Sequence, residues 1–132
     1  MNGVNLWAIL VAAVSAFVLG GLWYSPVLFG RPWQRAAGLG DDELRQRNAP
    51  LVFGGSFVLA LIAAFVFAMF LGPNASLALG LGAGVSAGLC WVAASLGINY
   101  LFERKSLRLF LINGGYHTLQ FTLYGLILAL WH

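Results

Sequence analysis

Charged side chains are scarce in this 132-residue sequence, which has seven Lys or Arg and four Asp or Glu residues, 8% of the total. Soluble domains carry about 25% charged residues. So few charges cannot cover a water-facing surface, and the composition therefore excludes a soluble globular enzyme. The charged residues fall into two clusters, at 31–47 and 103–108, which leaves 1–30, 48–102 and 109–132 without any.

Other absences narrow the chemistry. The only cysteine, Cys90, has no partner for an internal disulfide. No Walker sequence, HExxH, CxxC or nucleophile motif is present. The long apolar segments contain no Asp, Glu, Lys or Arg, which disfavours an ion-coupled transporter that relies on buried carboxylates. The sequence therefore nominates no catalytic residue, metal ligand or cofactor, and it leaves open whether the protein is an enzyme.

Hydrophobic residues make up 61% of the chain. A helix needs about 20 apolar residues to cross a bilayer, and an isolated strand cannot satisfy its backbone there. We therefore expect an all-α integral membrane fold, a single domain of four transmembrane helices in two helical hairpins. The N-terminal segment lacks a positive n-region, so we interpret it as a retained span rather than a signal peptide. The expected helices are 4–24, 51–71, 77–101 and 107–131.

The basic residues predict the orientation. All seven lie in the first and third connections, and none lies in the tails or in the turn at 72–76. The positive-inside rule places these connections in the cytoplasm and both termini outside. Such residues also contact anionic lipid headgroups, so the net charge of +3 requires no nucleic-acid partner.

The first connection carries two local signals. Trp23, Tyr24 and Trp33 lie near its start, as is typical of aromatic anchors at the headgroup level. Acidic residues precede arginines over 41–47, which predicts a short cytoplasmic surface helix with Asp41 as its N-cap. A divalent-cation site in this acidic run is disfavoured, because consecutive carboxylates splay around a helix. In the third connection, we expect Glu103 to pair with a nearby basic residue.

Small residues recur at intervals of four in three of the expected helices. Such stripes allow membrane helices to approach closely. The pattern predicts helix packing but does not decide between packing inside one chain and assembly of a homo-oligomer. The stripes are Gly80, Gly84 and Gly88; Ala12, Ala16 and Gly20; and Ala60, Ala64 and Ala68.

The last expected helix is the most polar. Its polar residues share one face, and His117 lies about 15 Å into the membrane. An ionisable residue at that depth indicates a candidate functional site. Three interpretations stay open: hydrogen bonds to neighbouring helices, for example to Ser95 or Asn99; a polar cavity or pore; or ligation of a metal or haem by His117. The face comprises Asn113, His117, Gln120 and Tyr124, with Tyr116 at its edge.

Three segments carry a family resemblance. They are Trp23–Trp33 (WYSPVLFGRPW), Asn99–Glu103 (NYLFE) and Ile112–Tyr116 (INGGY). Together they resemble the bacterial family called domain of unknown function 1761. The resemblance implies a small multi-pass protein of the bacterial inner membrane, and it transfers no catalytic or ligand residue.

These observations favour a non-enzymatic membrane protein. The leading interpretation is an oligomeric subunit that lines a pathway for a small solute or serves as an interaction subunit, using the polar face of the last helix. The alternative is a small membrane enzyme or cofactor protein that acts through His117, Asn113 and Tyr124. Because only one histidine lies within a span, a bis-histidine haem would require a homodimer. The residues do not identify the small-molecule ligand.

Overall fold

A computed structural model describes residues 5–131, which contain helices and turns but no strand. The expected start of the first span at residue 4 and the C-terminal His132 lie outside this range. The helices are α1 (Leu6–Trp23), α2 (Gly30–Ala37), α3 (Asp41–Arg45), α4 (Ala49–Leu71), α5 (Leu77–Val85), η1 (Ser86–Ala93), α6 (Ala94–Phe102) and α7 (Leu107–Leu130).

Three helices are long and apolar enough to cross a membrane. They are α1, α4 and the continuous helix Leu77–Phe102, whose middle part, η1, is π-helical. The expected all-helical fold is therefore confirmed, and three of its helices are candidate membrane spans. Helix α7 has 24 residues, a length within the range of these three. Its polar side chains lower its hydropathy, and it is not among them.

Short polar residues begin the long helices. The side chains of Asn5, Asn48, Ser76 and Ser106 each accept a hydrogen bond from a backbone N–H in the first turn that follows. This satisfies donors that have no partner within the helix. Helix α4 ends at Leu71, and the C-cap residue Gly72 that follows has a φ of +86°, which favours glycine.

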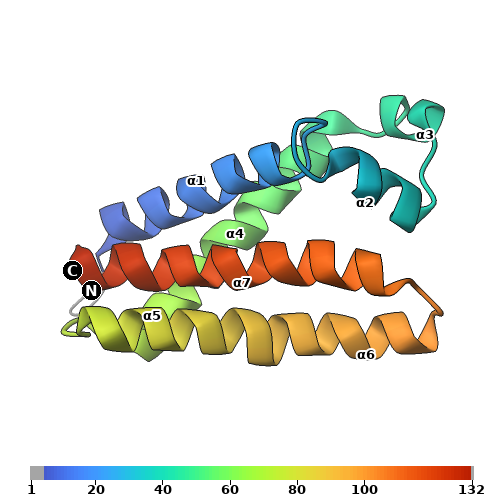
Figure 1. Cartoon of the computed structure of the whole chain (residues 1–132). Helices are drawn as coiled ribbons and strands as arrows, with labels where there is room; N and C mark the ends of the chain where they lie inside the picture. The colour runs from blue at the N-terminus through green and yellow to red at the C-terminus, as the bar shows by residue number, and fades with distance from the viewer. Residues whose placement is uncertain (1–4, 132) are drawn as a thin grey trace.

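Helix α7 lies at the centre of the arrangement (Figure 1). It packs along the composite helix α5–η1–α6 and, on another side, against α1. Helix α4 crosses behind at an angle and contacts both α1 and α7. The start of α1 and the end of α7 lie at one end of the molecule, and α2, α3 and the α6–α7 turn lie at the other.

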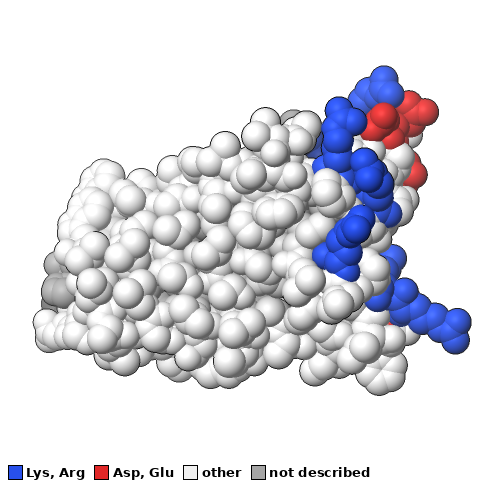
Figure 2. Space-filling view, in the orientation of Figure 1, with Lys and Arg blue, Asp and Glu red and all other residues white. Residues whose placement is uncertain are grey.

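The charged residues gather at one end of the molecule. Figure 2 shows the basic side chains as a band across the end that holds α2, α3 and the α6–α7 turn, while the body of the bundle carries none in this view. The two charged segments of the sequence are therefore brought to one end. From here on we call this the charged end, and the opposite end the uncharged end.

The short surface helix is present, but it begins differently from the prediction. Its N-cap is Gly40, not Asp41, so that part of the prediction is wrong. The Gly40 N–H donates to Glu43 Oε1 at 3.1 Å, while the Asp41 carboxylate accepts from Gln34 Nε2 at 2.6 Å. Gln34 belongs to α2, a second surface helix that the sequence did not indicate, and it uses the carboxylate that was expected to cap α3.

Candidate functional site

Close backbone contact with α5 and η1 positions α7. A Cβ added at Gly80, Gly84 or Gly88 would overlap the backbone of α7. This glycine stripe therefore serves packing within the chain, as small residues commonly do between membrane helices. On the other side of α7, Ala12 and Ala16 of α1 are fully buried. Further along α1, Gly20 lies against the ring of Tyr116. The small residues of the third stripe are buried in the core, namely Ala60, Ala64 and Ala68 of α4.

Asn113 joins three helices at the charged end. Its Oδ1 accepts a hydrogen bond of 2.6 Å from the hydroxyl of Tyr24, which follows α1. Its Nδ2 donates to the hydroxyl of Tyr100 on α6 at 2.8 Å. Both ends of the amide thus have a partner, which removes most of the cost of placing it inside a bundle.

Aromatic side chains surround this amide. Trp23 Nε1 donates to the carbonyl of Ile112 at 2.8 Å, and the ring of Trp33 contacts that of Tyr24 edge-on at 5.3 Å. Trp23 and Tyr24, predicted as interface anchors, therefore also bind the interior of the protein. We call Trp23, Tyr24, Tyr100 and Asn113 the Asn113 cluster.

The cluster joins the three segments that carry the family resemblance. Trp23 and Tyr24 come from the first, Tyr100 from the second and Asn113 from the third. Sequence reasoning missed Tyr100 as a partner and named Ser95 and Asn99 instead. Those two side chains are exposed, and within residues 5–131 neither forms a hydrogen bond. Tyr100 lies one residue further around the helix, and its long ring reaches α7.

A second polar chain runs along α7 toward the uncharged end. His117 Nδ1 lies 2.6 Å from Gln120 Oε1, and Gln120 Nε2 donates to the Tyr124 hydroxyl at 2.8 Å. That hydroxyl donates to the carbonyl of Ala60 on α4 at 3.2 Å. Gln120 and Tyr124 are buried, with exposed fractions of 7% and 0%. The remaining polar residue of this helix face, Tyr116, donates to the Ala16 carbonyl at 3.0 Å.

The direction of this chain sets the histidine tautomer. The Tyr124 hydroxyl donates its proton to the Ala60 carbonyl, so its oxygen accepts from the side-chain N–H of Gln120. The Oε1 atom of Gln120 then faces the imidazole of His117. Nδ1 therefore carries a proton, and in the neutral ring Nε2 then has the lone pair. The ring is half-buried beside that of Tyr116, with centroids 5.0 Å apart. Among residues 5–131, nothing forms a hydrogen bond with Nε2.

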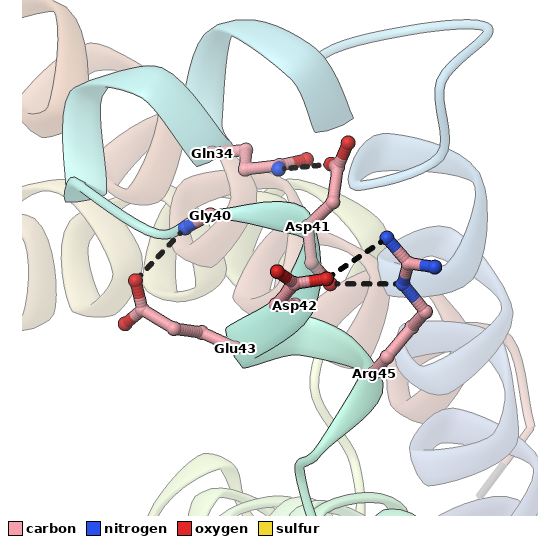
Figure 3. A network of polar contacts seen from close by, with 6 residues as sticks. All are labelled: Gln34, Gly40, Asp41, Asp42, Glu43 and Arg45. Carbon is pink, nitrogen blue, oxygen red and sulfur yellow. Dashed lines mark hydrogen bonds and ion pairs between the residues drawn. The ribbon is translucent and has the colours of Figure 1, made fainter.

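The acidic residues of the first connection do not converge. Figure 3 shows Asp41, Asp42 and Glu43 directed to three different partners, and the pair between Asp42 and Arg45 measures 3.1 Å. The expected pairing of Glu103 does not occur, because the Asp42–Arg45 contact is the only ion pair in the described part of the chain.

Comparison with known proteins identifies the family. No curated protein and no solved structure matches this chain. A family model described as a protein of unknown function, DUF1761, matches residues 7–129. The match includes every residue of the Asn113 cluster and of the hydrogen-bond chain from His117 to Ala60. The chain therefore belongs to the DUF1761 family.

Proposed function

We propose that the protein spans the bacterial inner membrane four times, with its charged end in the cytoplasm. Helix α7 is 24 residues long, about 36 Å, which exceeds the hydrocarbon thickness of about 30 Å. Its buried polar groups are hydrogen-bonded inside the bundle, as a membrane span requires. The band of basic side chains in Figure 2 supports the orientation.

A pair of reporter fusions tests this orientation. A reporter that is active only in the periplasm should be active when it is joined after residue 132. The same reporter should be inactive when it is inserted at Gly38–Gly40, between α2 and α3. A cytoplasmic signal from the C-terminal fusion contradicts the proposed orientation.

Within this topology, we propose a non-enzymatic subunit that binds a small polar solute at His117, along a pathway formed in a homo-oligomer. The observation that carries this proposal is that His117 Nε2 has no hydrogen-bond partner among residues 5–131. Asn113, Gln120 and Tyr124 on the same helix face have protein partners, so a single chain offers no continuous polar lining. Among residues 5–131, His117 Nε2 is the one side-chain nitrogen of this face that has no hydrogen-bond partner.

The same nitrogen supports a second candidate, a cofactor protein. Neutral imidazole with a free lone pair is a ligand for zinc, copper or haem iron. Its Nδ1–H is already oriented by Gln120, which is the type of second partner that metal-bound histidines use. A haem with two histidine ligands of this kind needs two copies of the chain.

Purified protein in liposomes distinguishes the two candidates. We expect a colourless, metal-free protein that increases the permeability of the vesicles to glycerol or to protons. The permeability should fall to the level of empty vesicles in His117→Ala. The matched control is Thr118→Ala, because the Thr118 hydroxyl bonds only to the Gly114 carbonyl of its own helix.

Each other result has a definite meaning. Bound metal or visible absorbance that disappears in His117→Ala favours the cofactor protein over the pathway. Vesicles that stay tight to both probes, or a flux unchanged in His117→Ala, contradict the solute pathway.

A further inference from the structure

The composite helix α5–η1–α6 changes its register against α7 at η1. Before η1, successive contacts come four residues further along on both helices. These contacts pair Gly80 with Gly125, Gly84 with Phe121 and Gly88 with His117. The next contact joins Ala93 to Gly114, where an added Cβ would lie 3.2 Å from the Cβ of Ala93. From Gly88 to Ala93 the composite helix advances by five residues, while α7 advances by only three. Segment η1 therefore contains an extra residue.

The π-helical geometry of η1 accommodates this extra residue. An α-helix bonds each N–H to the carbonyl four residues earlier, and a π-helix bonds it to the carbonyl five residues earlier. Eight residues, Ser86–Ala93, are π-helical, and the helix is α-helical on both sides of them. Leu89, Cys90 and Trp91 are consecutive exposed residues of this segment, so its wider turn lies on the side away from α7.

An extra residue changes the direction of every side chain that follows it. Successive residues of an α-helix differ in direction by about 100°. Ser95 and Asn99 lie seven and eleven residues after Gly88. In an uninterrupted α-helix both would point within about 20° of the direction of Gly88 and would face α7, as we expected from the sequence. The extra residue in η1 turns α6 by about 100°, and both side chains are exposed instead.

The turned α6 fits α7 better than an uninterrupted helix would. Gly97 lies against the ring of Phe110, where an added Cβ would come within 2.9 Å. In an uninterrupted α-helix Leu96 would take this direction, and its larger side chain would overlap the ring. The same rotation directs Tyr100 toward Asn113, and the Tyr100 hydroxyl accepts the 2.8 Å hydrogen bond from the Asn113 amide. Both the packing and the hydrogen bond of α6 therefore require the extra residue.

We propose that η1 is a one-residue register insertion that selects Tyr100, and not Asn99, as the partner of Asn113. The glycines of α5 set the direction of the composite helix at one end, and the Asn113 cluster sets it at the other. No single α-helical register satisfies both ends, and η1 supplies the difference. π-helical turns occur frequently at functional sites, and this one positions a polar cluster. The proposal does not depend on a ligand at His117.

Disulfide trapping in the full chain, with Cys90→Ser as the background, tests the register. Ala93→Cys combined with Gly114→Cys should form a disulfide on mild oxidation, because the two Cβ atoms are within reach of one another. Val92→Cys combined with Gly114→Cys is the matched control. It should stay reduced, because position 92 differs in direction from position 93 by about 100°. A disulfide from position 92 in preference to position 93 overturns the proposal, because α-helical spacing then continues through η1.

Two changes of chain length test whether one residue of η1 is extra. Deletion of Cys90, an exposed residue of η1, should leave an uninterrupted α-helix in which Ala93 and Tyr100 still face α7. We expect its unfolding midpoint in SDS to stay close to that of the wild type, and trapping between positions 93 and 114 to persist.

Insertion of one Ala after residue 90 is the opposite change at the same place. It adds a second extra residue, so it should lower the midpoint and abolish the trapping. In an ordinary α-helix, deletion and insertion would turn α6 by the same angle in opposite directions and would be equally harmful. Equal losses from the two changes, a larger loss from the deletion, or an insertion without effect each overturn the proposal.

Discussion

Helix α7 is held to its neighbours in two different ways at its two ends. Toward the uncharged end, Gly80 and Gly84 bring its backbone against that of α5 without any polar side chain. At the charged end, Asn113 connects it through side chains to α6 and to the end of α1. Both contacts join the same helix, so they form an internal comparison of packing with hydrogen bonding.

The two ends of α7 use different interactions because the segments that they contact differ in regularity. Two helices in lipid gain little from apolar burial, because lipid is as apolar as their side chains, and close packing has to supply the attraction. Glycine allows that packing along a straight pair of helices. The charged end contains an irregular segment after α1, and a hydrogen bond with a defined direction can hold such a segment where ridge-and-groove packing is absent.

The largest effect should come from Gly84→Leu. A side chain at this position overlaps the backbone of Phe121 and Thr122 and separates α5 from α7. We expect a loss of about 3 kcal/mol in the free energy of unfolding, measured by SDS titration in mixed micelles. Gly82→Leu is the control, because the space around Gly82 on the same helix is open. Equal stability of the two variants would refute internal packing by the glycine stripe.

The next effect should come from Asn113→Ala. This change leaves the hydroxyls of Tyr24 and Tyr100 without their partner, and we expect a loss of about 1–2 kcal/mol by the same titration. Asn99→Ala, at an exposed position with no such bond, should cost nothing measurable. A double variant with Tyr24→Phe should lose less than the sum of its two single changes. Strict additivity would show that the cluster does not act as a unit.

A smaller effect is expected for Tyr124→Phe. The ring and its contacts with Phe67 and Phe121 remain, and only the hydrogen bonds to Gln120 and to the Ala60 carbonyl disappear. Hydrogen bonds between membrane helices contribute about 0.6 kcal/mol on average, so we expect a loss of that order. Tyr124→Ala, which also creates a cavity, should cost several times more. If Tyr124→Phe were as unstable as Tyr124→Ala, the hydrogen bonds and not the ring contacts would account for the loss, which would contradict this expectation.

The smallest effect is expected for Asp42→Asn. This change removes the ion pair with Arg45, in which both side chains are mostly exposed. Such surface pairs contribute about 0–1 kcal/mol, and salt screens them. We expect the unfolding midpoint to stay within experimental error at low and high ionic strength. A clear loss of stability at low salt would contradict this expectation, and it would show that the Asp42–Arg45 ion pair contributes to the stability of the fold.

Much of the fold follows from local sequence patterns. Charged clusters that interrupt long apolar runs indicate where the membrane helices lie, because burying a charge in hydrocarbon is costly. Glycines at intervals of four indicate a close helix contact. Helix α2 was not predicted, since Gly30 and Pro32 are typical of a loop. The N-cap of α3 was placed one residue late because Gln34 uses the Asp41 carboxylate, a contact that a reading of one segment does not reveal.

The candidate site, like the fold, follows in part from the sequence and in part from the tertiary structure. The polar face of the last helix is visible in the spacing of Asn113, His117 and Gln120 along a helix. The partners of that face are not visible, because Tyr24 lies 89 residues from Asn113 along the chain. Neighbouring positions such as Asn99 and Tyr100 differ in direction by about 100° around the helix, and the rotation of α6 against α7 decides which of them makes contact.

Composition and spacing, which are properties of single segments, thus set the membrane character of the chain, its helices and the end at which its charges gather. Tertiary packing decided that the glycine stripe faces α7 and that Asn113 joins three distant segments. It also decided that His117 Nδ1 faces the side-chain oxygen of Gln120, because that orientation depends on a hydrogen-bond chain ending on the carbonyl of another helix. Such contacts depend on how helices cross and rotate against one another, which no single stretch of residues specifies.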